Sequence, residues 1–222
     1  MKVEKEIKKL YKNRFNEKEI KQENITWKVL CDLFFQKYIK KDSTVLDIGA
    51  GYCEFINNIK CNKKYALDLN EDIFCFANRD VKVFIGKSTN LSFLTDKSVD
   101  LVFMSNFLEH LRTKEEIKKS LTEIRRVLKI EGGVMILQPN IRYAYKEYWD
   151  FFDHYTPLSH KSLIEVLQML SFRIDKVLPQ FLPYTTKSKI PKNAILVKLY
   201  LKLPFIWKLI GKQMFVLVRK PC

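Results

Sequence analysis

A short apolar run followed by a glycine turn offers the clearest chemistry in the sequence. Val45–Ile48 predicts a buried strand, and Gly49 and Gly51 then allow a tight turn and a close approach to a ligand. The dinucleotide fingerprint needs a third glycine where this chain has Glu54. A carboxylate at a helix N-terminus repels a pyrophosphate, so we expect a nucleoside ligand without phosphates, with Asp47 receiving a cationic amine.

An acidic residue ends the next predicted strand, where a ribose-binding group is expected. Asp68 lies 21 residues after Asp47, which matches the spacing of about 20 residues in nucleotide-binding α/β folds. Its carboxylate can accept two hydrogen bonds from ribose hydroxyl groups. The glycine turn and Asp68 together therefore predict a nucleoside site.

Two histidines could take a proton from a hydroxyl group, because imidazole titrates at about pH 6.5. His110 follows the strand predicted at 99–104, and His154 follows the strand predicted at 133–138. Both rings could therefore converge at the carboxyl edge of a parallel sheet. We predict His154 as the base, His110 as a mainly site-shaping catalytic residue, and His160 as the start of a helix.

Four motifs in order make the chain similar to the class I S-adenosylmethionine (SAM)-dependent methyltransferases. They lie within Val45–Phe55, Tyr65–Leu69, Asn90–Leu111 and Arg126–Asn140. The resemblance runs from about Thr44 to Ile174. It implies SAM as cofactor and S-adenosylhomocysteine (SAH) as product. It also implies a doubly wound, Rossmann-like α/β fold, with seven mostly parallel strands, an antiparallel last strand and helices on both faces.

The same resemblance implies the roles of individual residues. Leu69 would pack on the adenine, the Ser88–Leu91 loop would flank its other side, and Asn106 would line the methyl-donor pocket. Lys87 stands where many relatives carry an Asp for the adenine amino group, so Ser88, Thr89 or backbone must substitute. The implied cofactor-binding residues are Asp47, Gly49, Gly51, Asp68, Leu69, Ser88, Thr89, Asn90, Leu91 and Asn106.

Some relatives bind a divalent ion through a Glu-x-x-Glu-His run and a later histidine. In this chain the run begins with Asn106, which lacks the first carboxylate. We therefore expect no metal. If an ion were bound, its remaining ligands would be Glu109, His110 and His154.

These residues must be positioned by an alternation of strands and helices. We predict strands at 44–48, 64–68, 81–85, 99–104, 133–138, 172–178 and 215–219. We predict two helices within 4–40 and others at 53–60, 71–78, 114–128 and 160–170. The chain is expected to be one methyltransferase domain, 1–222, with N-terminal helices at 1–42, a SAM-binding core at 43–178 and a basic insertion or lid at 179–213.

Composition is that of an ordinary globular protein, with 47% hydrophobic and 29% charged residues. We expect no signal peptide, and the five scattered cysteines favour a reducing cytoplasm. The net charge of +15 is concentrated at one end, because Lys176–Cys222 holds ten Lys or Arg and no Asp or Glu. The basic 187–212 segment is expected to be a lid, with peripheral contact to the inner membrane face as the alternative.

The acceptor is expected to be a small molecule or a glycan. Seven aromatic residues crowd into 143–155 and could stack on sugar rings. A looser resemblance, from His154 to Phe215, is to methyltransferases of bacterial cell-surface polysaccharide synthesis, and it implies O-methylation of a sugar hydroxyl. Two alternatives stay open: a methyltransferase of RNA or of a quinone-like small molecule, and a non-catalytic SAM-fold binding module. A nucleic acid partner is disfavoured because no separate RNA-binding module is visible.

Overall fold

The computed structural model describes residues 17–184 and 193–222. Seven strands form a mixed sheet in the order β3-β2-β1-β4-β5-β7-β6. Their bounds are β1 (Thr44–Ile48), β2 (Lys63–Asp68), β3 (Val81–Ile85), β4 (Val99–Ser105), β5 (Leu128–Pro139), β6 (Arg173–Leu182) and β7 (Gln213–Arg219). Strand β7 runs antiparallel to both β5 and β6, whereas β1–β2, β2–β3 and β4–β5 are parallel pairs. The predicted Rossmann-like class with an antiparallel last strand is confirmed.

The chain divides into two compact units, each described separately here. Unit 1 contains Met1–Lys87 and Ile190–Lys202, and unit 2 contains Ser88–Lys189 and Leu203–Cys222. Strands β1 to β3 therefore belong to unit 1, and β4 to β7 belong to unit 2.

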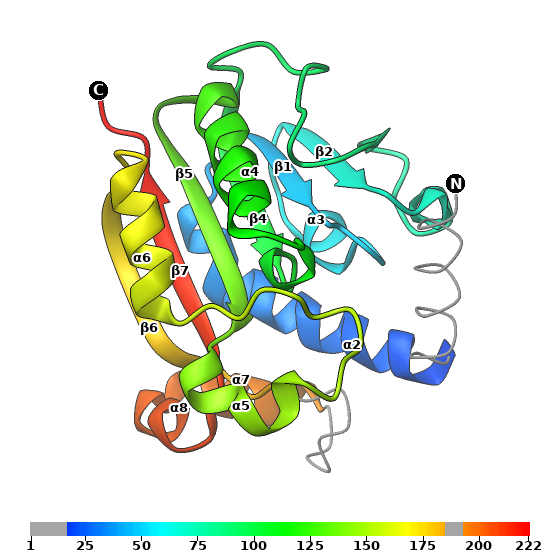
Figure 1. Ribbon diagram of the computed structural model, residues 1–222. Coiled ribbons are helices and arrows are strands. Elements are labelled where there is room, and N and C mark those ends of the chain that lie inside the picture. Colours follow the sequence, from blue (N-terminus) through cyan, green and yellow to red (C-terminus); the bar gives the residue numbers. More distant parts are fainter. Residues whose placement is uncertain (1–16, 185–192) are drawn as a thin grey trace. The chain divides into compact units, whose positions relative to one another are not determined.

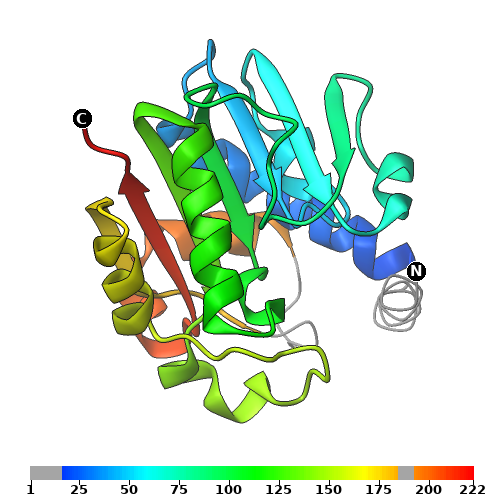
Figure 2. The same cartoon turned by 45° about the horizontal axis from the view of Figure 1, so that its top comes forward.

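Unit 1 is built on β1, which is buried along its whole length, as is usual for an internal strand of a parallel sheet. Figure 2 shows β1, β2 and β3 side by side. Among the described residues, the helices of this unit are α2 (Glu17–Leu30), α3 (Glu54–Asn58) and α7 (Ala194–Lys202), and α2 contacts both of the others. A π turn, η1 (Cys31–Phe35), and a 3-10 turn, η2 (Gln36–Tyr38), continue α2 toward β1.

Unit 2 carries α4 (Lys114–Val127), α5 (Ile141–Tyr148), α6 (His160–Met169) and α8 (Pro204–Ile210). Figure 1 shows α4 and α6 over the same face of the strands of this unit. Helix α4 begins where the Thr113 hydroxyl accepts the Glu116 N–H, with acidic residues in its first turn and basic residues in its last. Its buried residues recur at helical spacing.

Several elements differ from the prediction. The expected helix at 71–78 is a short 3-10 turn, η3 (Glu71–Cys75), and α5 was not predicted at all. Strand β6 continues to Leu182, so the first residues of the expected 179–213 insertion belong to the sheet. Within the expected 4–40 region, α2 accounts for the second predicted helix, and the first falls largely outside the described residues.

The described part of the segment between β6 and β7 contains two helices, α7 and α8, separated by Leu203. Pro204 occupies the first turn of α8, so it ends one helix and begins the next, as its fixed φ favours.

Across residues 17–184 and 193–222, no helix combines the length and the apolar character needed to cross a bilayer.

Candidate functional site

The turn after β1 is held in a left-handed conformation. Gly49 and Gly51 have φ of 69° and 51°, and Cys53, a non-glycine residue, has φ of 60°. The N–H groups of Gly49 and Ala50 donate to the carbonyl oxygen of Leu67, at 2.8 and 3.2 Å. The two glycines of the motif are therefore required by backbone geometry.

Asp68 is the centre of this half of the site. Its Oδ2 accepts the N–H of Gly51 at 2.9 Å, and its Oδ1 accepts the N–H of Asn70 at 2.8 Å. A Cβ added to Gly51 would meet nothing within 4 Å, so the space beside the turn is open. The structure thus brings Gly51 and Asp68 together as predicted, and Leu69 follows directly at the half-buried end of β2.

Asp47 is buried among other carboxylates. Burial, together with the negative charges of Glu54 and Asp68, raises the pKa of Asp47 well above its ordinary value, although the N–H of Ile56 donates to it. The turn therefore has a field that favours a cationic group.

The loop predicted to flank the adenine begins unit 2, and α4 holds it in place. Ser88 and Leu91 are buried, Thr89 is half-buried and Asn90 is exposed. The N–H of Leu91 donates to Glu123 at 2.9 Å, and the Arg126 guanidinium donates to the carbonyl oxygens of Leu91 and Leu94. These contacts, contributed by α4, fix the path of the loop.

Asn106 follows β4 in a left-handed conformation, with φ of 47°. Its side-chain oxygen accepts a hydrogen bond from Gln213 Nε2 at 2.7 Å, and its N–H donates to the carbonyl oxygen of Leu137. Asn106 is exposed, so its side chain is fixed in direction without being buried.

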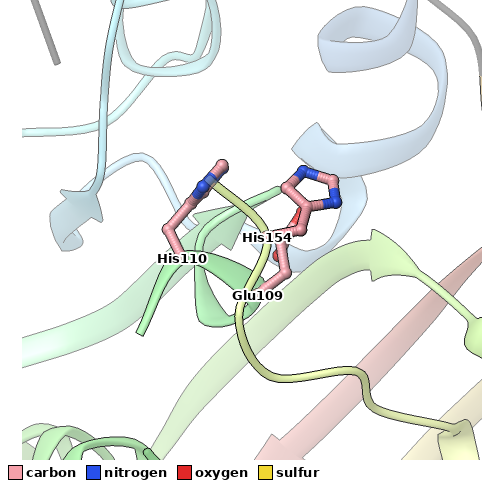
Figure 3. Close-up of side chains that lie close together, drawn as sticks. All are labelled: Glu109, His110 and His154. Atoms are coloured by element: carbon pink, nitrogen blue, oxygen red, sulfur yellow. The ribbon is translucent and has the colours of Figure 1, made fainter. Parts of the chain in front are cut away.

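Three candidate ligating side chains gather after β4 and α5. One ligand atom each from Glu109, His110 and His154 lies within 4.8 Å of the others. Glu109 and His110 belong to a 3-10 turn, η4 (Leu108–His110), and His154 belongs to the loop after α5 (Figure 3). Backbone N–H groups of Tyr155 and Thr156 donate to the carbonyl oxygen of Glu109, which ties the two segments together.

His110 is oriented by Asp153. Its Nδ1 lies 2.9 Å from the Asp153 carbonyl oxygen and 3.2 Å from the Asp153 carboxylate, so Nδ1 carries a proton and Nε2 of the neutral ring is an acceptor. Burial lowers the pKa of His110, but the Asp153 hydrogen bond and the charges of Glu109 and Asp153 outweigh it and raise the pKa.

Glu109 is 1% exposed. Within the described residues, neither of its carboxylate oxygens accepts a hydrogen bond from another residue. Burial raises the pKa of Glu109 to about 7, against the opposing influence of His110. Its carboxylate is therefore poised to receive either a proton or a cation.

His154 is held by aromatic rings. Its ring stacks on Phe151 at 4.8 Å between centroids and contacts Tyr148 at 4.7 Å and His110 at 5.0 Å. His160 is the first residue of α6, as predicted, and its Nδ1 lies 2.9 Å from the Asn140 amide.

Sequence reasoning missed the residues that position the predicted ones. These are Asp153, Tyr148, Glu123, Arg126 and Gln213. Asp153 could have been suspected from its place beside His154, but its contact with His110 spans 43 residues of chain. Glu123 and Arg126 contact the 91–94 loop across at least 32 residues, and Gln213 contacts Asn106 across 107, so no local pattern signals these contacts. Tyr148 lies close to His154 in the sequence, but it ends α5, a helix that was not predicted.

Comparison with known proteins finds a family match over part of this chain. Residues 46–136 match the family described as Methyltransferase domain. An uncharacterized protein of Methanocaldococcus jannaschii is 33% identical over 124 residues, which are 55% of this chain and 53% of that protein. The chain thus spans about half the length of this curated relative.

Solved structures share the fold at low identity. A SAM-dependent methyltransferase from Archaeoglobus fulgidus has a TM-score of 0.62 and 23% identity, over 84% of this chain and 90% of that one. One from Thermotoga maritima, described as a possible histamine N-methyltransferase, has a TM-score of 0.63 and 18% identity, over 89% of this chain and 91% of that one. The [4+2]-cyclase SpnF has a TM-score of 0.62 and 15% identity, over 87% of this chain and 80% of that one.

The cyclase shows that this fold also supports other reactions, so the fold does not by itself identify an acceptor. The matched segment contains the glycine turn, Asp68 and the Glu109–His110 pair. Residues 46–136 therefore match a methyltransferase domain, and the chain shares the Rossmann-like fold of the solved SAM-dependent methyltransferases; the match and the fold together imply S-adenosylmethionine as cofactor.

Proposed function

We propose that the chain is a SAM-dependent methyltransferase that methylates a hydroxyl group, with a sugar or glycan as acceptor. The observation that carries the proposal is the oriented His110, whose Nδ1 is engaged by Asp153 and whose Nε2 is left to accept a proton. Such an imidazole is the group that hydroxyl deprotonation requires.

The residues of unit 1 fit the implied cofactor. SAM supplies an electrophilic methyl group on a positively charged sulfur. The raised pKa of Asp47 reports a negative field that would favour this charge and the ammonium group of the methionine part. Asp68 would bind the ribose hydroxyls, and Gly51 leaves room beside the turn.

The acceptor side is argued from unit 2. His110 would take the hydroxyl proton through Nε2, and Asp153 would hold the ring and stabilise its charged form. His154, which we predicted as the base, is buried against Phe151 and Tyr148, so we propose it as the residue that positions His110.

The sugar acceptor is supported by exposed aromatic rings near this cluster. Tyr145, Trp149, Phe152 and Tyr155 are all exposed, and Phe152 is 87% exposed. They belong to α5 and the loop that carries His154. Aromatic faces stack on the apolar faces of sugar rings, so this surface suits a carbohydrate better than a small polar acceptor.

The test begins with isothermal titration of SAH, with NAD as control. Purified protein is then incubated with methyl-labelled SAM and separate pools of nucleotide sugars, quinols and transfer RNA. Label in the nucleotide sugars, lost in His110→Ala with SAH affinity retained, supports the proposal. Label only in quinols or RNA contradicts the acceptor class, and absence of SAH binding leaves the non-catalytic binding module as the better explanation.

A second candidate is metal-assisted methylation, favoured by the clustering of Glu109, His110 and His154. Two imidazoles and a carboxylate form a ligand set that zinc and similar ions accept, and Asp153 would orient His110 as outer partners of metal-bound histidines do. Elemental analysis of purified protein, before and after EDTA, tests this. A stoichiometric ion that is lost in Glu109→Gln supports it. A metal-free protein that takes up no zinc or manganese on titration contradicts it.

A further inference from the structure

The basic, apolar segment before β7 has no part in the proposed chemistry. Lys176–Cys222 holds ten Lys or Arg and no acidic residue. Helices α7 and α8 lie within it, separated by Leu203. Both helices are rich in large apolar side chains, and several of these are exposed.

Helix α7 is apolar on both of its sides. Its inner side contacts α2 and η1. On its outer side, Ile195 is 72% exposed and Leu199 is 52% exposed, one helical turn apart, with Leu196 beside them. Lys198 and Lys202 are exposed next to these residues. The outer side is thus an apolar strip flanked by ammonium groups.

Helix α8 repeats the pattern within unit 2. Trp207 turns inward and packs against Phe181 at 5.0 Å between ring centroids. Phe205 and Leu209 point outward, four residues apart, and are 63% and 75% exposed. Lys208 is exposed between them. Exposed apolar side chains of this size on two successive helices are unusual for a surface that faces only water.

The lysines of these helices are available to an external partner. Further along the segment, Lys212 pairs with Glu147, and Lys220 donates to the carbonyl oxygens of Arg125 and Leu128. In contrast, Lys198, Lys202 and Lys208 form no ion pair with any residue described by the structure. With no acidic residue in the segment, every charged side chain that it contributes is positive.

We propose that α7 in unit 1 and α8 in unit 2 each bind the surface of an anionic lipid bilayer. The apolar side chains would enter the acyl boundary, and the flanking lysines would contact lipid phosphates, an arrangement typical of helices that lie in a membrane interface. Peripheral attachment needs no spanning helix. The inference stands apart from the proposed reaction, because none of these residues belongs to the candidate site.

The experiment is co-sedimentation of the full chain with vesicles of phosphatidylcholine, with or without about 30% phosphatidylglycerol, in low and high salt. We expect binding to the anionic vesicles at low salt. Lys198→Gln/Lys202→Gln/Lys208→Gln should lower the partition coefficient roughly a hundredfold, since each lysine contributes about fivefold. Phe205→Ser/Leu209→Ser should lower it at least about tenfold, because two large side chains no longer enter the boundary.

Matched variants elsewhere on the chain test whether binding depends on α7 and α8 or only on total charge and total hydrophobicity. Lys114→Gln/Lys118→Gln/Lys119→Gln on α4 removes the same charge, and Ile130→Ser/Met169→Ser removes exposed apolar side chains. Both should bind as the wild type does, and SAH titration checks that every variant is folded. Absence of binding, or equal loss in the α4 variant, overturns the proposal. The proposal is also overturned if sedimentation velocity shows self-association that Phe205→Ser/Leu209→Ser abolishes, because these side chains would then bind a second copy of the chain.

Discussion

Asp68 joins two tasks in one carboxylate. It accepts the N–H groups of Gly51 and Asn70, and by family resemblance it would bind ribose. The same residue therefore shapes the glycine turn and recognises the ligand. A carboxylate suits this position even before a cofactor binds, since each of its two oxygens accepts one of the two N–H groups.

Asp68→Ala should lower SAH affinity by at least about tenfold, because hydrogen bonds to charged groups are each worth roughly 1.5–3 kcal/mol. Isothermal titration measures it. Asp80→Ala is the control, since Asp80 is an exposed residue at the opposite end of this sheet region, paired with Lys64. Equal affinity in Asp68→Ala and wild type would remove the ribose assignment.

Asp153→Asn should lower the pKa of His110. The variant loses the carboxylate charge that raises this pKa, while burial, which lowers it, stays. NMR titration of the ring protons measures the shift, with the His160 signal assigned by His160→Gln. Asp150→Asn, an exposed change three residues away, should leave the titration as in wild type. An unchanged His110 pKa in Asp153→Asn would mean that the Asp153 carboxylate does not stabilise the charged ring.

Glu109 should make the folded protein less stable as pH rises. Its folded pKa of about 7 lies above the ordinary 4.5, so the folded state holds a proton that the unfolded chain has lost. The unfolding free energy therefore falls between these two pH values, by about 1.4 kcal/mol for each unit of pKa shift. Urea unfolding across this pH range, measured in EDTA, should show a smaller fall in unfolding free energy for Glu109→Gln than for the wild type. Glu115→Gln, exposed on α4, should keep the wild-type slope, and identical slopes in all three proteins would refute the assignment.

At the scale of elements, α4 acts as an anchor for the loop that begins unit 2. Arg126 donates to Leu91, Leu94, Asp96 and Glu123. Its buried neighbours keep the helix against the sheet, so the guanidinium can hold the loop at a fixed distance. The loop thus takes its shape from a helix that follows it by more than twenty residues.

Arg126→Met should lower the unfolding free energy by about 2 kcal/mol, because two backbone carbonyls and Glu123 lose their donor. Urea denaturation measures this. Lys118→Met, on the exposed side of the same helix, should change stability by no more than about 0.5 kcal/mol. A loss in Arg126→Met as small as that of the control would show that the loop does not depend on this anchor.

The sequence predicted elements well where one local pattern decided them. Strand β1 is a short run of apolar and β-branched residues around Asp47, and α6 begins at a serine cap. Helix α5 was missed because its aromatic residues suggested a binding loop, although Asn140 caps it. The π turn at Cys31–Phe35 has no sequence signal, and its last residue, Phe35, packs edge-on against Phe55, which lies in another helix.

At the scale of the whole molecule, cofactor binding should raise stability through mass action. SAH at a hundredfold excess over its dissociation constant adds about 2.7 kcal/mol to the unfolding free energy. A chain of this size should then melt roughly 5–10 °C higher. Differential scanning calorimetry measures this, with NAD giving no shift and Asp68→Ala losing at least about half of it. An equal shift with NAD would argue against the implied cofactor.

The order of the strands in unit 2 also has a consequence for biosynthesis. Strand β7 lies between β5 and β6, yet the ribosome makes it about thirty residues after β6 ends. Until β7 emerges, β5 and β6 each present an unpaired edge that invites pairing with another nascent chain. Completion of this half of the sheet is therefore a late event of synthesis, and the interval before it is when the newborn polypeptide most needs a chaperone.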